Sequence, residues 1–250
     1  MLVKLPAVVR RHIKPNSFAG IGMSSAVVKR RQRTEEIRRE VVIGSLRLAG
    51  DLRVPPGATV LVVFVHGSGS SRLSPRNTAV ARTLNEQGIA TLLFDLLTPD
   101  EELDRANVFD IPLLAERLVD VVGWIGEQPD LAGLRLGFFG ASTGAAAALV
   151  AAATLGARVG AVVSRGGRPD LADMALDNVA APTLLIVGGR DAGVIELNES
   201  AYARLRCRKS IEIVSGATHL FPEPGAMEAV IALAVRWFKT HLVQPSEKPR

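Results

Sequence analysis

A five-residue segment in the middle of the chain, Gly140-Ala141-Ser142-Thr143-Gly144, constrains the fold more than any other part of the sequence. It follows an apolar run that ends at Phe139 and precedes an alanine-rich run over 145–155. A serine at a sharp turn between a strand and a helix has a strained backbone, so the residues two positions away must be glycine to avoid clashes. The pattern therefore predicts a nucleophile elbow with Ser142 at its tip.

Apolar runs and helical patterns alternate along the rest of the chain. We expect strands at 39–43, 45–54, 60–65, 89–94, 134–139, 159–164, 183–187 and 211–214, and helices at 75–87, 110–127, 145–155, 195–206 and 225–241. Strands that alternate with helices predict an α/β fold with a mostly parallel, doubly wound sheet, here with an N-terminal antiparallel hairpin. In the last helix, Val230, Leu233 and Trp237 are expected to face inward.

The connection between the strands at 159–164 and 183–187 limits how the site is covered. Fewer than 20 residues separate Ser164 from Pro182. Such a connection is too short for a cap domain, so we expect an open, shallow site at the carboxyl ends of the strands.

Charge is distributed unevenly between the N-terminal segment and the rest of the chain. The net charge is +5, but residues 1–34 hold eight basic residues and no acid, so +5 less +8 leaves −3 for the remainder. We interpret 1–34 as a basic extension, 35–242 as one domain and 243–250 as a tail. A mildly acidic domain does not favour nucleic-acid binding. Arg10-Arg11 is also compatible with a twin-arginine export signal, and Met23 with an alternative start.

The single cysteine, Cys207, and the absence of a long apolar stretch bear on location. One cysteine cannot form an intramolecular disulfide, and this fits a reducing compartment. No apolar run reaches the length of a membrane span. The sequence therefore predicts a soluble, cytoplasmic protein with no membrane partner.

A serine nucleophile needs a base that accepts its proton and a carboxylate that orients the base. Of the four histidines, His219 follows the last predicted strand, whereas the others lie in the basic extension, in a glycine-rich loop and at the end of the last helix: His12, His66 and His241. Asp191 comes shortly after the strand at 183–187. We therefore expect His219 as the base and Asp191 as the acid.

Two of these assignments have structural alternatives. Ser142 could only cap the helix after it, although that role requires no glycine on either side. Asp191 could likewise cap its following helix, and Asp170 or Asp173 would then supply the acid from the preceding loop.

An oxyanion hole requires two backbone N–H groups directed at the developing negative charge. Thr143 follows the nucleophile at a helix N-terminus, and Ser68 lies in the loop after the first buried strand. We expect these two amides to form the hole. His66 and Gly67 are expected to shape that loop without taking part in the chemistry.

Four arginines fall on loops at the same predicted edge of the sheet: Arg72, Arg165, Arg168 and Arg190. Guanidinium groups suit carboxylate or phosphate, so Arg72, Arg165 and Arg168 are candidates for binding an anionic group of the substrate. The alternative is that the arginines form structural ion pairs with Asp95, Asp170 or Asp173, or are solvated.

Four motifs of the chain together resemble the dienelactone-hydrolase-like group of α/β-hydrolases, over roughly residues 36–242. These motifs are His66-Gly67-Ser68-Gly69, Gly140–Gly144, Gly188–Asp191 and Gly216–His219. The resemblance implies an α/β-hydrolase fold, a triad in the chain order Ser142, Asp191, His219, and hydrolysis of ester-type bonds. Dienelactone hydrolases carry cysteine at the position of Ser142, so the dienelactone substrate itself is not implied.

Related chains, some fused to a phosphoribosyltransferase domain, resemble this sequence in Ser68–Arg72 and Ser164–Asp170. We expect no phosphoribosyltransferase segment in this sequence.

The remaining patterns disfavour other kinds of site. The histidines and Cys207 lack metal-ligand spacing, and Gly67-Ser68-Gly69 does not complete a dinucleotide-binding motif, so we expect no metal and no cofactor. The sequence thus predicts a serine hydrolase, carboxylesterase-like, for a small-molecule ester or lactone. Acyl transfer or carbon–carbon bond hydrolysis by the same triad is an alternative, as is a non-catalytic binding module with a basic tail.

Overall fold

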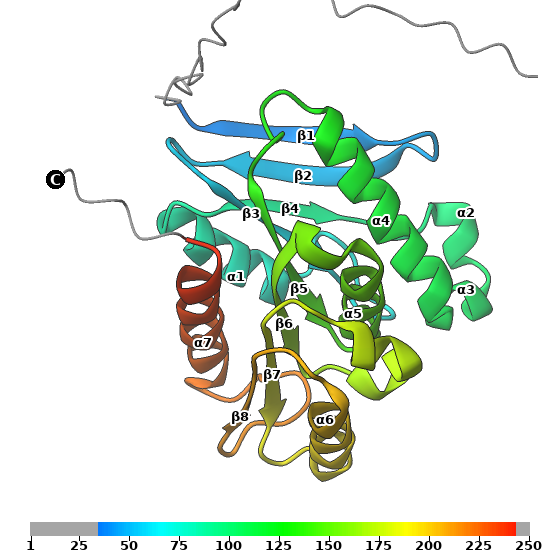
Figure 1. Ribbon diagram of the computed structural model, residues 1–250, viewed down its shortest axis with the longest axis vertical. Coiled ribbons are helices and arrows are strands. Elements are labelled where there is room, and N and C mark those ends of the chain that lie inside the picture. Colours follow the sequence, from blue (N-terminus) through cyan, green and yellow to red (C-terminus); the bar gives the residue numbers. More distant parts are fainter. Residues whose placement is uncertain (1–34, 244–250) are drawn as a thin grey trace, which may run out of the picture. The chain divides into compact units, whose positions relative to one another are not determined.

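The structure is a computed structural model that describes residues 35–243, built around one eight-stranded sheet (Figure 1). The predicted basic extension, 1–34, and residues 244–250 of the predicted tail, 243–250, lie outside the described residues. The strands are β1 (Ile37–Ile43), β2 (Leu48–Val54), β3 (Val60–Val65), β4 (Ala90–Phe94), β5 (Arg135–Ala141), β6 (Val159–Arg165), β7 (Thr183–Gly188) and β8 (Lys209–Val214). The helices are α1 (Pro75–Glu86), α2 (Pro99–Glu102), α3 (Arg105–Phe109), α4 (Ile111–Glu127), α5 (Thr143–Leu155), α6 (Ala192–Arg204) and α7 (Ala226–His241), with 3-10 segments η1 (Gly156–Arg158) and η2 (Pro169–Asn178).

The strand order is β1-β2-β4-β3-β5-β6-β7-β8. β2 pairs antiparallel with both β1 and β4, and the remaining pairs are parallel. The expected α/β architecture with an N-terminal antiparallel hairpin is therefore confirmed. The hairpin turns at Gly44, whose φ of 63° suits a residue without a side chain, and the N–H of Arg47 donates to its carbonyl at 3.2 Å.

Helices cover both faces of the sheet, with α1 and α7 on one side and α4 and α5 on the other (Figure 1). The side chains of β3 alternate between the two cores. Val60, Val62 and Phe64 pack with α1 and α7, whereas Leu61, Val63 and Val65 pack with α4 and α5. Burial on both faces is why this strand is apolar at every position.

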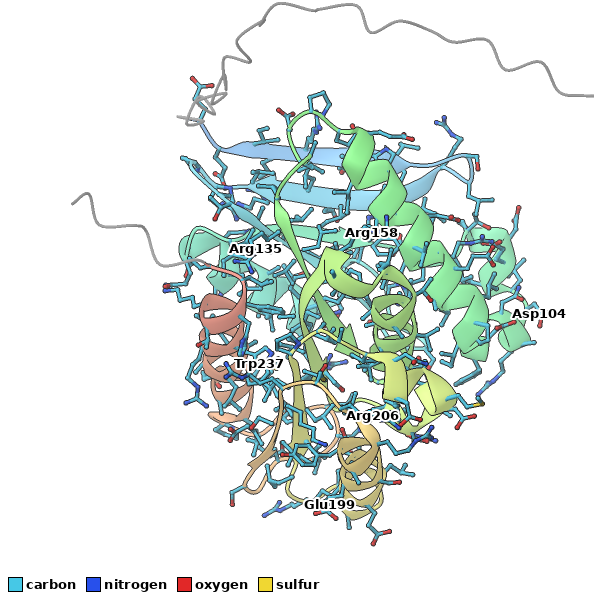
Figure 2. The ribbon with its side chains drawn as sticks, viewed as in Figure 1. Asp104, Arg135, Arg158, Glu199, Arg206 and Trp237 are labelled. Atoms are coloured by element: carbon cyan, nitrogen blue, oxygen red, sulfur yellow. The ribbon has the colours of Figure 1, made fainter. Side chains whose placement is uncertain are left out.

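The buried stripe of α7 differs from the expected one. Val230 is buried as expected, but Ala234 and Phe238 complete the stripe, while Leu233 and Trp237 are only partly buried. Phe238 can approach because the strand beneath it has glycine at 137, where a Cβ would lie 3.0 Å from its ring. Trp237, labelled on α7 in Figure 2, lies beside the stripe and donates from Nε1 to the carbonyl of Pro182 at 3.3 Å.

Two short helices, α2 and α3, lie between β4 and α4 and were not expected from periodicity. Neither buries a residue, so neither has an apolar stripe. The first is set by a capping box, in which Thr98 and Glu101 bond reciprocally, at 3.3 and 2.9 Å. Asp110 caps α4 as expected, accepting from the N–H of Leu113 at 3.0 Å. Between β6 and β7 the chain forms only η2, so no cap domain covers the strand ends there.

No helix within residues 35–243 is both long and apolar enough to cross a membrane.

Candidate active site

The predicted elbow lies between β5 and α5, and its serine has the expected strained backbone. Ser142 has φ 50° and ψ −125°, a region that side-chain-bearing residues rarely adopt. A Cβ at Gly140 would lie 2.5 Å from Cα of Ala145, and one at Gly144 would lie 2.3 Å from the carbonyl oxygen of His66. The glycines are therefore required by close packing of backbone on backbone. The Ser142 side chain makes no capping bond to α5, unlike the N-cap alternative.

The predicted acid and base come from the loops after β7 and β8. Asp191 Oδ2 lies 2.7 Å from Nδ1 of His219, within hydrogen-bond distance. The side chain of Asp191 does not cap α6, and its carboxylate bonds to the histidine instead. With Nδ1–H donating to the carboxylate, the neutral imidazole keeps Nε2 as the unprotonated nitrogen.

Backbone contacts hold these two loops together. The N–H of Gly189 donates to the carbonyl of Val214 at 2.9 Å, and that of Arg190 donates to Ala217 at 2.8 Å. A Cβ at Gly188 would lie 2.6 Å from the carbonyl oxygen of Ala217, so the approach requires glycine. The orientation of His219 towards Asp191 is therefore set by the backbone as well as by the side chains.

The segment Arg165–Arg168 contacts both the serine and the histidine. The N–H of Ser142 donates to the carbonyl of Arg165 at 3.3 Å, and that of Arg168 donates back to Ser142 at 3.1 Å. A Cβ at Gly166 would lie 2.9 Å from the carbonyl oxygen of His219 and 3.7 Å from its Cε1. Ser142 and His219 thus border one four-residue segment. Their side chains share no hydrogen bond in this structure, a common state of catalytic pairs without substrate.

The two alternative acids are engaged elsewhere. Asp170 accepts two hydrogen bonds from Arg168, at 2.9 and 2.7 Å. Asp173 pairs with Arg204 at 3.1 Å. Of the three candidate carboxylates, Asp191 is the one that the structure brings to His219.

The expected oxyanion loop is tied to the elbow. The N–H of Ser68 donates to Oγ1 of Thr143 at 2.9 Å, so one predicted oxyanion donor is occupied by the side chain of the other. A Cβ at Gly67 would lie 2.8 Å from Cβ of Ser142, which places this loop directly against the serine. The amides of Ser68 and Thr143 are thus close to the nucleophile, and the hydroxyl of Thr143 accepts the hydrogen bond from Ser68.

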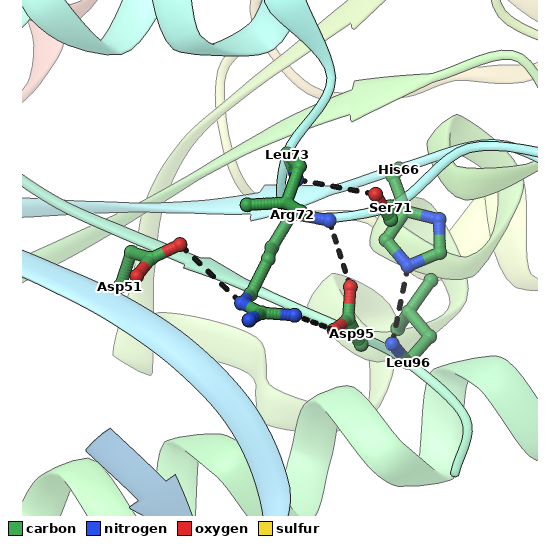
Figure 3. Close-up of polar contacts among 7 residues, drawn as sticks. All are labelled: Asp51, His66, Ser71, Arg72, Leu73, Asp95 and Leu96. Carbon is green, nitrogen blue, oxygen red and sulfur yellow. Dashed lines mark hydrogen bonds and ion pairs between the residues drawn. The ribbon is translucent and has the colours of Figure 1, made fainter. Parts of the chain in front are cut away.

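His66 holds the same loop in place. Its Nε2 accepts from the N–H of Leu96 at 3.2 Å (Figure 3). Nδ1 therefore carries the proton and donates to the carbonyl of Gly67 at 3.1 Å. Burial lowers the pKa of His66 below its ordinary value, which keeps the ring neutral. This arrangement agrees with the expected shaping role.

A cavity of about 390 Å³ lies beside the loop that begins at His66. It is bounded by the loop on one side and by apolar side chains that follow β4 or belong to α3 and α4: Leu96, Leu97, Val108 and Leu114. Sequence patterns did not identify this lining, because α3 has no buried stripe of its own. The cavity can accept a small group beside this loop, and Glu102 also lines it.

The candidate arginines fall into two kinds. Arg72 pairs with Asp95 at 2.5 Å and with Asp51 at 3.4 Å (Figure 3), and Arg168 pairs with Asp170. These two match the structural alternative. Arg165 is buried and donates from Nη2 to Oδ1 of Asn77 at 3.2 Å, a partner that the sequence did not suggest. Arg190 is exposed.

Within residues 35–243, no group of three or more His, Cys, Asp or Glu side chains is placed to hold a metal ion.

Known proteins of similar structure share the fold of this chain. No protein-family model matches the chain. The crystal structure of a dienelactone hydrolase from Anabaena variabilis has 54% sequence identity and a TM-score of 0.79, and the match covers 83% of this chain and 98% of that one. Est1E from Butyrivibrio proteoclasticus has 18% identity, a TM-score of 0.67 and coverage of 81% and 97%, which shows the fold alone.

Curated relatives from two strains of Mycobacterium tuberculosis are 58% identical over 228 residues, which is 91% of this chain and 51% of theirs. Their names provisionally call them phosphoribosyl transferases. The chain spans about half the length of these relatives.

Proposed function

Because the chain belongs to the dienelactone-hydrolase-like group of α/β-hydrolases, we propose that it is a serine hydrolase that cleaves an ester or lactone through an acyl-enzyme on Ser142. The observation that carries this proposal is the 2.7 Å contact between Asp191 and His219, on loops at the same sheet edge as the strained serine. A serine nucleophile requires a histidine that is oriented by a carboxylate, and this contact provides that arrangement.

The reaction proceeds in two steps on this arrangement. Oγ of Ser142 attacks the carbonyl carbon while its proton passes to Nε2 of His219, and the imidazolium then protonates the leaving alkoxide. Water next attacks the acyl-enzyme, with His219 as base, which releases the acid and restores the hydroxyl. Asp191 keeps the imidazole oriented and stabilises its protonated form.

The oxyanion is stabilised by the amides of Thr143 and Ser68. The first is at the N-terminus of the 13-residue α5, where the helix dipole also favours negative charge. The second exchanges its hydrogen bond to Oγ1 of Thr143 for one to the substrate oxygen. Because the hydroxyl satisfies this N–H in the resting protein, the donor is held in position before substrate arrives.

The open cavity beside the oxyanion loop receives the acyl or alcohol part of the substrate. Its volume of about 390 Å³ and its leucine and valine side chains suit a small group. We further propose a cytoplasmic location, which fits the single cysteine, Cys207.

Turnover of short-chain aryl esters tests the proposal. Ser142→Ala should abolish hydrolysis, with kcat lower by about 10⁴-fold or more, and should leave the fold intact by circular dichroism. Ser164→Ala is a matched control, because Ser164 is buried and its hydroxyl has no partner among the described residues. Wild-type turnover by Ser142→Ala would contradict the mechanism.

A further inference from the structure

Arg165 combines deep burial with an unbalanced charge. It is 5% exposed, and its Nε is enclosed without a hydrogen-bond acceptor. Its guanidinium forms no ion pair with any carboxylate of residues 35–243. Residues 1–34 contain no acidic residue, and residues 244–250 contain one, Glu247. A buried charge without a counterion is strongly unfavourable, so its retention requires a reason outside the packing of the protein.

A second guanidinium lies near the first. Arg76, on the first turn of α1, is partly buried, has an enclosed Nε without a partner, and forms no ion pair within the described part of the chain. Burial, together with the charge of Arg76, lowers the pKa of Arg165 to about 10. Arg165 therefore remains protonated at neutral pH.

The helix they meet adds to the positive potential. Nη2 of Arg165 reaches Asn77 on the first turn of α1, a 12-residue helix with no acidic residue in that turn. The N-terminal end of a helix carries a partial positive charge and favours anions. Two cations and a helix terminus thus converge where residues 35–243 supply no carboxylate partner.

This cluster lies close to the nucleophile. The carbonyl of Arg165 accepts from the N–H of Ser142 at 3.3 Å, and neighbouring strands lie only about 4.8 Å apart. The backbone of Arg165 therefore adjoins that of the nucleophile, and its side chain extends from there to Asn77. Arg72 and Arg168, in contrast, already carry their own carboxylates.

We propose that Arg165 and Arg76, together with the N-terminal end of α1, bind the carboxylate or phosphate group of an anionic substrate whose ester or lactone carbonyl lies against Ser142. This inference rests on the proposed function, because it takes Ser142 as the nucleophile. It assigns substrate charge recognition to one pair of arginines and excludes Arg72 and Arg168 from that role.

Matched ester pairs test the charge preference. Aryl esters of succinic, glutaric and adipic acid with a free terminal carboxylate are compared with the corresponding neutral methyl esters, by kcat/KM at constant ionic strength. For the best chain length the wild type should prefer the anionic ester by about 10-fold or more, as a charge-assisted hydrogen bond allows. Arg165→Met should reduce this ratio by about 10-fold, and Arg168→Met should retain it.

Arg76→Met provides a second variant in case the first does not fold, and it should also reduce the ratio. Equal hydrolysis of anionic and neutral esters by the wild type would overturn the proposal. An equal loss of preference in Arg165→Met and Arg168→Met would overturn it as well.

Binding of succinate and of inorganic phosphate is measured separately by thermal unfolding, with chloride at matched ionic strength as the control. At saturation the better anion should raise the Tm of the wild type by about 4 °C, but not that of Arg76→Met. The anion that acts distinguishes carboxylate from phosphate recognition. If no ester is hydrolysed but this shift is present, the proposed function fails and the anion site stands. If esters are hydrolysed without preference and neither anion binds, the anion site fails alone.

Discussion

The acid and base of the candidate triad, after β7 and β8, bond to each other, whereas two arginines, one at the end of β6 and one at the start of α1, have no counterion among the described residues. Asp191 bonds to His219, and Glu223 accepts from the N–H of Thr218 at 3.0 Å. Arg165 and Arg76 have no carboxylate partner within residues 35–243. His219 and Arg165 both contact the backbone around Ser142, but only the histidine has an ionisable partner within residues 35–243.

This difference separates two requirements of catalysis. A base must be oriented before the reaction, so its carboxylate has to be part of the protein. A cation that recognises substrate binds it more strongly when it lacks an internal counterion, because a permanent counterion would compete with the substrate. Arg168, which faces Asp170, shows what an arginine of the same loop looks like when it is structural.

The largest effect is expected from breaking the paired region. Asp191→Asn should lower kcat by about 10⁴-fold without unfolding the protein, because an amide no longer holds the imidazole in the tautomer with Nε2 unprotonated. Steady-state kinetics with an aryl ester measures this loss.

Asp170→Asn serves as the control, since its carboxylate faces Arg168 and not the histidine. If Asp170→Asn lost as much activity as Asp191→Asn, the acid would be misassigned.

A smaller effect on stability is expected at the elbow that both regions share. Gly144→Ala places a Cβ 2.3 Å from the backbone oxygens of Val65 and His66, so β3 and α5 must separate. The free energy of unfolding should fall by about 3 kcal/mol or more, as for other severe overpacking. Gly193→Ala in α6, where nothing lies within 4 Å, should instead be neutral or stabilising. Chemical denaturation distinguishes the two, and equal effects would refute the packing explanation.

Substitution of Arg165, which has no counterion, should change the free energy of unfolding in the opposite direction. Arg165→Met removes a buried charge without a counterion, so the free energy of unfolding should rise by about 1 kcal/mol, although Asn77 loses its hydrogen bond. Arg168→Met removes a partly exposed pair and should change stability by less than about 1 kcal/mol. Urea denaturation without added phosphate measures both. A large loss of stability in Arg165→Met would show that this arginine is structural.

The smallest effect is a pH dependence from His66. Because burial lowers its folded-state pKa below 6.5, the unfolded chain binds the proton more readily. The neutral His66 ring contributes fully to stability above about pH 6.5. This contribution is lost as the pH falls towards the lowered pKa, and the free energy of unfolding then falls by at most about 1.4 kcal/mol per pH unit.

Urea denaturation across this range should show a shallower slope for His66→Gln than for the wild type. The pKa of His241 is also lowered by burial, so His241→Gln measures its separate share. An unchanged slope in His66→Gln would contradict the assignment.

Much of the fold was predictable because buried strands are apolar at every position. β3 was placed at both ends, and β4 to β7 within one or two residues. α6 begins at Ala192, three residues earlier than expected, because it buries only Asn198 and Ala201 and shows no clear periodicity. α2 and α3 bury nothing and depend on local caps.

The site divides in the same way. Ser142, Asp191 and His219 could be proposed from the sequence because each follows a strand and each motif is local in sequence. Arg76 was missed because its significance depends on Arg165, far away in the chain. The sequence also could not decide which arginines have partners, because Asp51 and Asp95 reach Arg72 only through the pairing of β2 with β4.

Mass spectrometry of the protein after reaction with a fluorophosphonate tests the central proposal most directly. The reagent should add to one peptide, the one containing Ser142, and the addition should disappear in Ser142→Ala and slow by orders of magnitude in Asp191→Asn and His219→Asn. A protein that remains unlabelled, or that is labelled at another residue at the same rate in all three variants, would contradict a nucleophilic serine at the elbow.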